Sequence, residues 1–212
     1  MNKEVLKICY VDDNIDPYLM SYIDFYTNLY NEKNSKLVIE AYEYEIKEDD
    51  TYKSLLNQNL ITESNILLLD SEFFSSASKS NSSLTGEQFL IILRKILPFI
   101  KTIVITQNEI EHPALTVEKF KSALSDNAEI DSITYYNEKL KKFLDQSLSE
   151  HIEEKKILKE LKRNNETDEL LYDTIEMSLD GLEDDTIFEK EELNELIILF
   201  KQIKEGFPNA WL

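Results

Sequence analysis

Short, mostly apolar runs alternate with amphipathic stretches over the first two-thirds of the chain. An apolar run that ends in a polar turn residue is typical of a buried parallel strand. Four such segments are predicted strands: residues 4–11, 65–70, 101–106 and 131–136. Residues 36–46 alternate apolar and polar positions, which predicts a further, more exposed strand. Apolar residues at helical spacing predict helices over residues 17–31, 50–60, 85–98, 115–126 and 138–163.

This order of strands and helices predicts an α/β fold with a doubly wound parallel sheet. With five strands, the flavodoxin-like order 2-1-3-4-5 is the natural arrangement. Residues 71–84 contain seven serines and no periodicity, which indicates a long polar loop after the third strand. We expect the sheet domain to cover residues 1–148.

The remaining residues, 149–212, predict an acidic helical extension. Residues 164–168 interrupt the long helix, and helical patterns resume over 168–180 and 189–205. The last pattern carries an apolar stripe of Leu193, Leu196, Ile197, Phe200 and Ile203. Such a stripe requires a partner surface, either on the sheet domain, on a second copy or on another protein.

The charge balance limits the expected binding partners, and the length of the apolar runs limits the expected compartment. The chain has 23 basic and 42 acidic residues and a net charge of −19, so direct DNA binding is not expected. The short basic clusters at residues 139–142 and 155–163 are interpreted as solvated helix faces. No apolar run approaches the roughly 20 residues of a membrane span, so we expect a cytoplasmic protein without membrane contact. The lone Cys9 is interpreted as part of the core.

Polar residues follow the predicted strands at their carboxyl ends. Asp12 and Asp13 follow the first strand, Asp70 the third and Thr106 the fourth, and Lys139 lies just beyond the fifth. In an open α/β sheet these ends converge on one crevice. The sequence therefore predicts a pocket with three carboxylates, a hydroxyl and an ammonium group, which suits a divalent metal and a phosphorylatable aspartate.

These residues resemble the receiver domain of two-component response regulators, over roughly residues 4–148. The resemblance implies that Asp70 accepts a phosphoryl group, with Thr106 and Lys139 binding its oxygens. It also implies a Mg²⁺ ion held by Asp12, Asp13, Asp70 and the backbone carbonyl of Glu72. Tyr136, three residues before Lys139, matches the aromatic switch position of the family.

The chain also departs from this family. The successive intervals from Asp13 to Asp70, from Asp70 to Thr106 and from Thr106 to Lys139 are each longer than in typical receivers. The serine-rich segment lies beside Asp70. Leu140 follows Lys139 where the family usually has proline, and an alternative register would remove Lys139 from the pocket. The resemblance is therefore to a divergent receiver, similar to the receiver-like domains of bacterial conflict systems.

The leading hypothesis is a signalling receiver, phosphorylated by a sensor histidine kinase or another phosphodonor protein and read out through protein–protein contacts. Its enzymatic activity would be limited to forming and losing its own aspartyl phosphate; a metabolic enzyme is not expected. The alternative is a pseudo-receiver that is not phosphorylated and serves as a structural or regulatory subunit of a larger complex, such as a bacterial defence system. An aspartate-nucleophile hydrolase ranks lower, because Glu72 stands where such enzymes carry a second aspartate, and a DNA mimic is suggested by charge alone.

Overall fold

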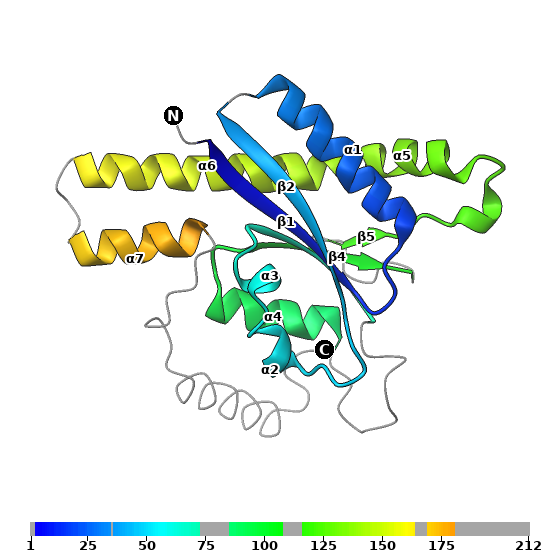
Figure 1. The fold of residues 1–212 in the computed structure, drawn as a ribbon, viewed down its shortest axis with the longest axis horizontal. Coiled ribbons are helices and arrows are strands. Elements are labelled where there is room, and N and C mark those ends of the chain that lie inside the picture. The colour runs from blue at the N-terminus through cyan, green and yellow to red at the C-terminus, as the bar shows by residue number, and fades with distance from the viewer. Residues whose placement is uncertain (1–2, 35, 73–84, 108–115, 164–168, 181–212) are drawn as a thin grey trace. The chain divides into compact units, whose positions relative to one another are not determined.

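A computed structural model describes residues 3–34, 36–72, 85–107, 116–163 and 169–180 (Figure 1). Its centre is a sheet of five parallel strands in the order β2-β1-β3-β4-β5. The strands are β1 (Glu4–Asp12), β2 (Leu37–Glu45), β3 (Ile66–Asp70), β4 (Lys101–Thr106) and β5 (Thr116–Glu118). The predicted α/β class and strand order are confirmed.

Helices cover both faces of the sheet (Figure 1). Side chains of α1 (Pro17–Lys33), α5 (Ala128–Lys139) and α6 (Lys141–Arg163) form one core cluster with Leu6, Ile8 and Tyr10 of β1. Because successive side chains of a strand alternate between faces, Cys9 and Val11 point to the other side. The helices α2 (Tyr52–Leu55), α3 (Asn59–Thr62) and α4 (Gly86–Ile96) complete the set before β4.

The last strand is not where the sequence pattern predicted it. Residues 131–136 belong to α5, and strand five is the three-residue segment Thr116–Glu118, inside the segment predicted as a helix. The apolar run Ile133–Tyr136 has β-type composition, but Ser132 and Tyr136 are buried one helical turn apart, which satisfies a helix that packs on α1. Tertiary packing therefore overrides the local strand preference here.

The chain after the sheet continues as α5 and α6, which follow one another along one line in Figure 1. Helix α7 (Glu169–Asp180) packs against α6 through Leu158, Tyr172 and Leu179. Asn65, before β3, donates a side-chain hydrogen bond of 2.9 Å to the carbonyl of Leu179. The helix predicted at 168–180 is thus confirmed and belongs with the sheet.

The chain divides into two units, Met1–Leu182 and Glu183–Leu212. Residue 148, the expected domain boundary, lies inside α6. The predicted loop at 73–84 and the apolar stripe at 189–205 lie outside the described residues. Among the helices that are described, none is both long and apolar enough to cross a membrane.

Candidate functional site

The three aspartates predicted to converge do meet at the carboxyl ends of neighbouring strands β1 and β3. One carboxylate oxygen from each of Asp12, Asp13 and Asp70 lies within 4.8 Å of the others. Asp12 and Asp70 are buried, whereas Asp13 is half-buried at the mouth of the cluster. Burial of two neighbouring carboxylates is costly unless a cation or hydrogen bonds stabilise them.

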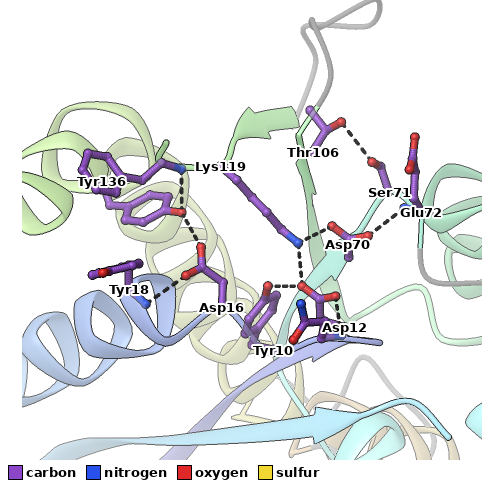
Figure 2. Close-up of polar contacts among 12 residues, drawn as sticks. Tyr10, Asp12, Asp16, Tyr18, Asp70, Ser71, Glu72, Thr106, Lys119 and Tyr136 are labelled. Atoms are coloured by element: carbon purple, nitrogen blue, oxygen red, sulfur yellow. Dashed lines mark hydrogen bonds and ion pairs between the residues drawn. The ribbon is translucent and has the colours of Figure 1, made fainter. Parts of the chain in front are cut away.

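That cation is Lys119, which the sequence interpretation placed in a helix. Its ammonium nitrogen lies 2.7 Å from Asp12 Oδ2 and 2.7 Å from Asp70 Oδ1 (Figure 2). Lys119 directly follows β5 and has a side chain only 8% exposed. The assignment of Lys139 to the pocket was wrong, because that residue ends α5 and is exposed.

The cluster perturbs the acid–base chemistry of its members. Burial, together with the neighbouring charge of Asp12, raises the pKa of Asp70, and this outweighs the opposing effect of Lys119. Burial alone would lower the pKa of Lys119, but its hydrogen bonds and attraction to the two aspartates raise it above the ordinary value. Lys119 is therefore a firmly charged ammonium group beside a carboxylate that binds protons more readily than usual.

Hydrogen bonds orient both buried carboxylates. The hydroxyl of Tyr10 donates to Asp12 Oδ2, and the backbone N–H of Asn14 donates to Asp12 Oδ1 at 3.0 Å. The backbone N–H of Glu72 donates to Asp70 Oδ2 at 2.8 Å. Burial and the charge of Asp12 raise the pKa of Tyr10, so its phenol stays a neutral donor.

Thr106 lies at the end of β4, as predicted, and is buried. Its hydroxyl accepts a hydrogen bond of 2.9 Å from the hydroxyl of Ser71, the residue after Asp70 (Figure 2). Its carbonyl accepts a backbone hydrogen bond from Lys119. Thr106 thus contacts both flanks of the site, the segment after β3 and the segment after β5. Two hydroxyl groups, rather than the single one expected, lie beside Asp70.

The segment after Asp70 leaves no room for a larger side chain at Gly86, the first residue of α4. A Cβ atom added to Gly86 would lie 2.1 Å from the carbonyl oxygen of Asp70. The backbone N–H of Gly86 also donates to the carbonyl of Ser71 at 2.9 Å. The start of α4 therefore fixes the backbone that carries the Asp70 carboxylate.

Tyr136 was predicted as a switch residue at the end of a strand, and this position was wrong. It lies in α5 and is fully buried, where its hydroxyl accepts a hydrogen bond of 3.0 Å from the backbone N–H of Phe120. The same hydroxyl donates to Asp16 Oδ2 at 3.3 Å, and Asp16 caps the amino terminus of α1 (Figure 2). Tyr136 therefore joins the loop after β1 to the residue after Lys119.

The donor set fits a hard divalent cation. Mg²⁺ binds through one or two carboxylates and keeps several waters, and the half-buried Asp13 places a carboxylate oxygen within 4.8 Å of those of Asp12 and Asp70. The backbone N–H of Glu72 faces Asp70; the predicted ligand role of the Glu72 carbonyl stays a prediction. Lys119 already supplies one positive charge to Asp12 and Asp70, so a cation would complement the ammonium group.

Comparison with known proteins does not assign this chain to a family. No protein-family model, no curated protein and no solved structure matches it.

Proposed function

We propose that this chain is a divergent receiver-like domain in which Asp70 accepts a phosphoryl group with the help of Mg²⁺. The observation that carries this proposal is the pairing of one lysine at the end of β5 with carboxylates from β1 and β3. The receiver family requires an ammonium group from the fifth strand, and Lys119 supplies it although the lysine expected from the sequence does not.

The transfer step follows from the orientation of Asp70. An oxygen of the ionised Asp70 carboxylate attacks the phosphorus atom of a phosphodonor, and a new oxygen–phosphorus bond forms. The bond from phosphorus to the donor's leaving group breaks, and that group departs with the electron pair and gains a proton from solvent. The product is an aspartyl phosphate, a known form of covalent catalysis.

The neighbouring groups would stabilise the charge that develops during this step. A bound Mg²⁺, held by Asp12, Asp13 and Asp70, would offset negative charge on the phosphoryl oxygens. The Lys119 ammonium, at 2.7 Å from Asp70, would bind one of these oxygens after leaving Asp12 or Asp70. The hydroxyl of Thr106, which accepts a hydrogen bond from Ser71, would donate its own proton to another of these oxygens.

A second candidate function is the pseudo-receiver, an unphosphorylated structural or regulatory subunit. The observation in its favour is that both carboxylate oxygens of Asp12 are bound by groups of the chain itself. Lys119 and Tyr10 bind Oδ2, and the backbone N–H of Asn14 binds Oδ1. A network that is satisfied by the chain's own groups can hold the fold together without a metal. The two candidates differ in one measurable property, the response to Mg²⁺.

The discriminating experiment is thermal unfolding with and without millimolar Mg²⁺. A ligand that binds only the folded state raises stability with its concentration, so the Tm should rise. Asp13→Ala should abolish the rise, whereas Lys139→Ala, an equally drastic change outside the site, should preserve it. A parent protein with no Mg²⁺ response supports the pseudo-receiver and eliminates the phosphoryl-acceptor proposal.

The proposed partners follow from this chemistry. The phosphoryl group would come from a sensor histidine kinase or another phosphodonor protein, and the readout would be contact with another protein or a second copy. The apolar stripe expected to make that contact lies outside the described residues.

A further inference from the structure

A groove lies at the opposite end of the sheet from Asp70. It has a volume of about 310 Å³ and lies between α6 and the first residues of β1 and β2, Glu4 and Leu37. Glu4 begins β1 and Asp12 ends it, so the two sites are separated by eight residues of strand, or about 26 Å. The groove is therefore separate from the proposed phosphoryl-acceptor site.

Basic residues of α6 recur along the groove. Lys155, Lys159 and Arg163 stand four residues apart, and Lys156 lies beside them. Residues with this spacing share one face of a helix. Lys156, Lys159 and Arg163 are exposed, as the interpretation of a solvated helix face requires, whereas Lys155 is buried and departs from it.

Two of these cations have no ion-pair partner at salt-bridge distance among the described residues. Lys155 pairs with Glu4 at 2.5 Å, and Lys156 pairs with Glu153 at 3.7 Å. No ion pair within the described part of the chain involves Lys159 or Arg163. The protein as a whole has a net charge of −19, whereas four basic residues line this groove.

The rest of the lining consists of one further carboxylate, Glu160, and three side chains with apolar or aromatic surface. Ile152, 45% exposed, and Leu37 line the groove with the ring of His151, which is only 2% exposed. Small-molecule sites typically combine apolar walls with a few convergent polar groups, and their volumes start at about 300 Å³. The groove lies at the lower end of this range, the size of a mononucleotide-like ligand.

We propose that this groove binds a small phosphorylated molecule with a compact organic body. Arg163 and Lys159 match the charge of a phosphoryl group, since guanidinium and ammonium groups form charge-assisted hydrogen bonds with its oxygens. Ile152 and Leu37 contact the organic body.

The net negative charge of the protein favours binding of a small anion over binding of a long polyanion. At physiological salt the attraction of the groove extends only about 8 Å. A nucleic acid or a long acidic peptide would reach beyond this distance and meet the surrounding negative charge. A ligand with one or two phosphoryl groups stays within the favourable region.

The test is isothermal titration of the full chain with inorganic phosphate, pyrophosphate and AMP, in the presence of a chelator so that no Mg²⁺ is bound at Asp70. AMP should bind more tightly than inorganic phosphate, because it also contacts the apolar wall. The double variant Lys159→Glu/Arg163→Glu should lose about tenfold or more in affinity, as expected for two charge-assisted hydrogen bonds. Asp70→Asn should bind normally, which separates this groove from the proposed function.

The matched control is Lys142→Glu. Lys142 is exposed on the same helix, about 25 Å along its axis from Lys159, so the substitution changes the charge of α6 outside the groove. It should leave AMP affinity within about twofold, because the separation exceeds the Debye length. The proposal is overturned if none of the three probes binds, if Lys142→Glu weakens AMP as much as the double variant does, or if a single-stranded oligonucleotide binds more tightly than AMP.

Discussion

Replacing Lys119 by methionine should destabilise the fold strongly. The substitution keeps most of the side-chain volume but leaves Asp12 and Asp70, both buried, without the ammonium group that lies 2.7 Å from each. Removing one partner of a buried ion pair costs about 3–5 kcal/mol. For a domain of this size each kcal/mol shifts the Tm by about 2–4 °C, so the expected loss is about 6–20 °C.

The loss should also depend on pH. Lys119 lowers the pKa of Asp70, so without it the carboxyl takes up a proton at higher pH than in the parent protein. A carboxyl whose pKa is raised on folding contributes stability at low pH and loses it as pH rises through the folded-state pKa. The difference between Lys119→Met and the parent should therefore be largest near neutral pH and should shrink on acidification.

The assay is urea unfolding followed by circular dichroism at several pH values, and Lys139→Met is the control. Lys139 is exposed at the end of α5, so its replacement should change stability by less than about 0.5 kcal/mol. The reasoning is refuted if Lys119→Met loses less than about 1 kcal/mol, if the loss does not vary with pH, or if Lys139→Met loses as much.

Three further predictions concern the groups around this pair. Asp70→Asn should raise stability near neutral pH without Mg²⁺, because the raised pKa of Asp70 means that its ionised form is disfavoured in the folded state; urea unfolding should show the gain vanish at low pH. Tyr136→Phe should cost about 1–3 kcal/mol by leaving the Phe120 N–H without its acceptor. Tyr22→Phe, which removes a buried hydroxyl with no hydrogen-bond partner among the described residues, should cost much less, and equal losses in denaturant melts would contradict the role given to Tyr136. Gly86→Ala should displace the backbone of Asp70, because its Cβ would lie 2.1 Å from the Asp70 carbonyl oxygen; a crystal structure or melting curve of the variant that matches the parent would disprove this.

The sequence pattern was sufficient for the sheet order and for the first four strands, because β1, β3 and β4 carry continuous apolar runs and β2 alternates apolar and polar residues. Asp12, Asp13, Asp70 and Thr106 follow such runs directly, so their placement at strand ends could be predicted. The fifth strand could not be found in this way. Thr116–Glu118 has a single fully apolar residue, Val117, and it pairs only at the edge of the sheet with β4.

The missed lysine illustrates how one displaced strand changes a site. Ile133–Tyr136 has the apolar and aromatic composition of a strand, so the first lysine after it was assigned to the pocket. The spacing of Ser132, Tyr136 and Leu140, all buried at intervals of four, is the helical indication that could have corrected this assignment. Contacts between separate elements determine the roles of Tyr10, Ser71 and Asp16. The periodicity of apolar residues along the sequence does not predict such contacts.

The most direct measurement is phosphoryl transfer to Asp70 itself. The full chain, incubated with a small-molecule phosphodonor and Mg²⁺, should gain the mass of one phosphoryl group in intact-protein mass spectrometry. The gain should require Mg²⁺, disappear in Asp70→Asn, fall sharply in Lys119→Met and persist in Lys139→Met. A chain that binds Mg²⁺ but gains no phosphoryl mass, or one that gains it equally in Asp70→Asn, contradicts the account.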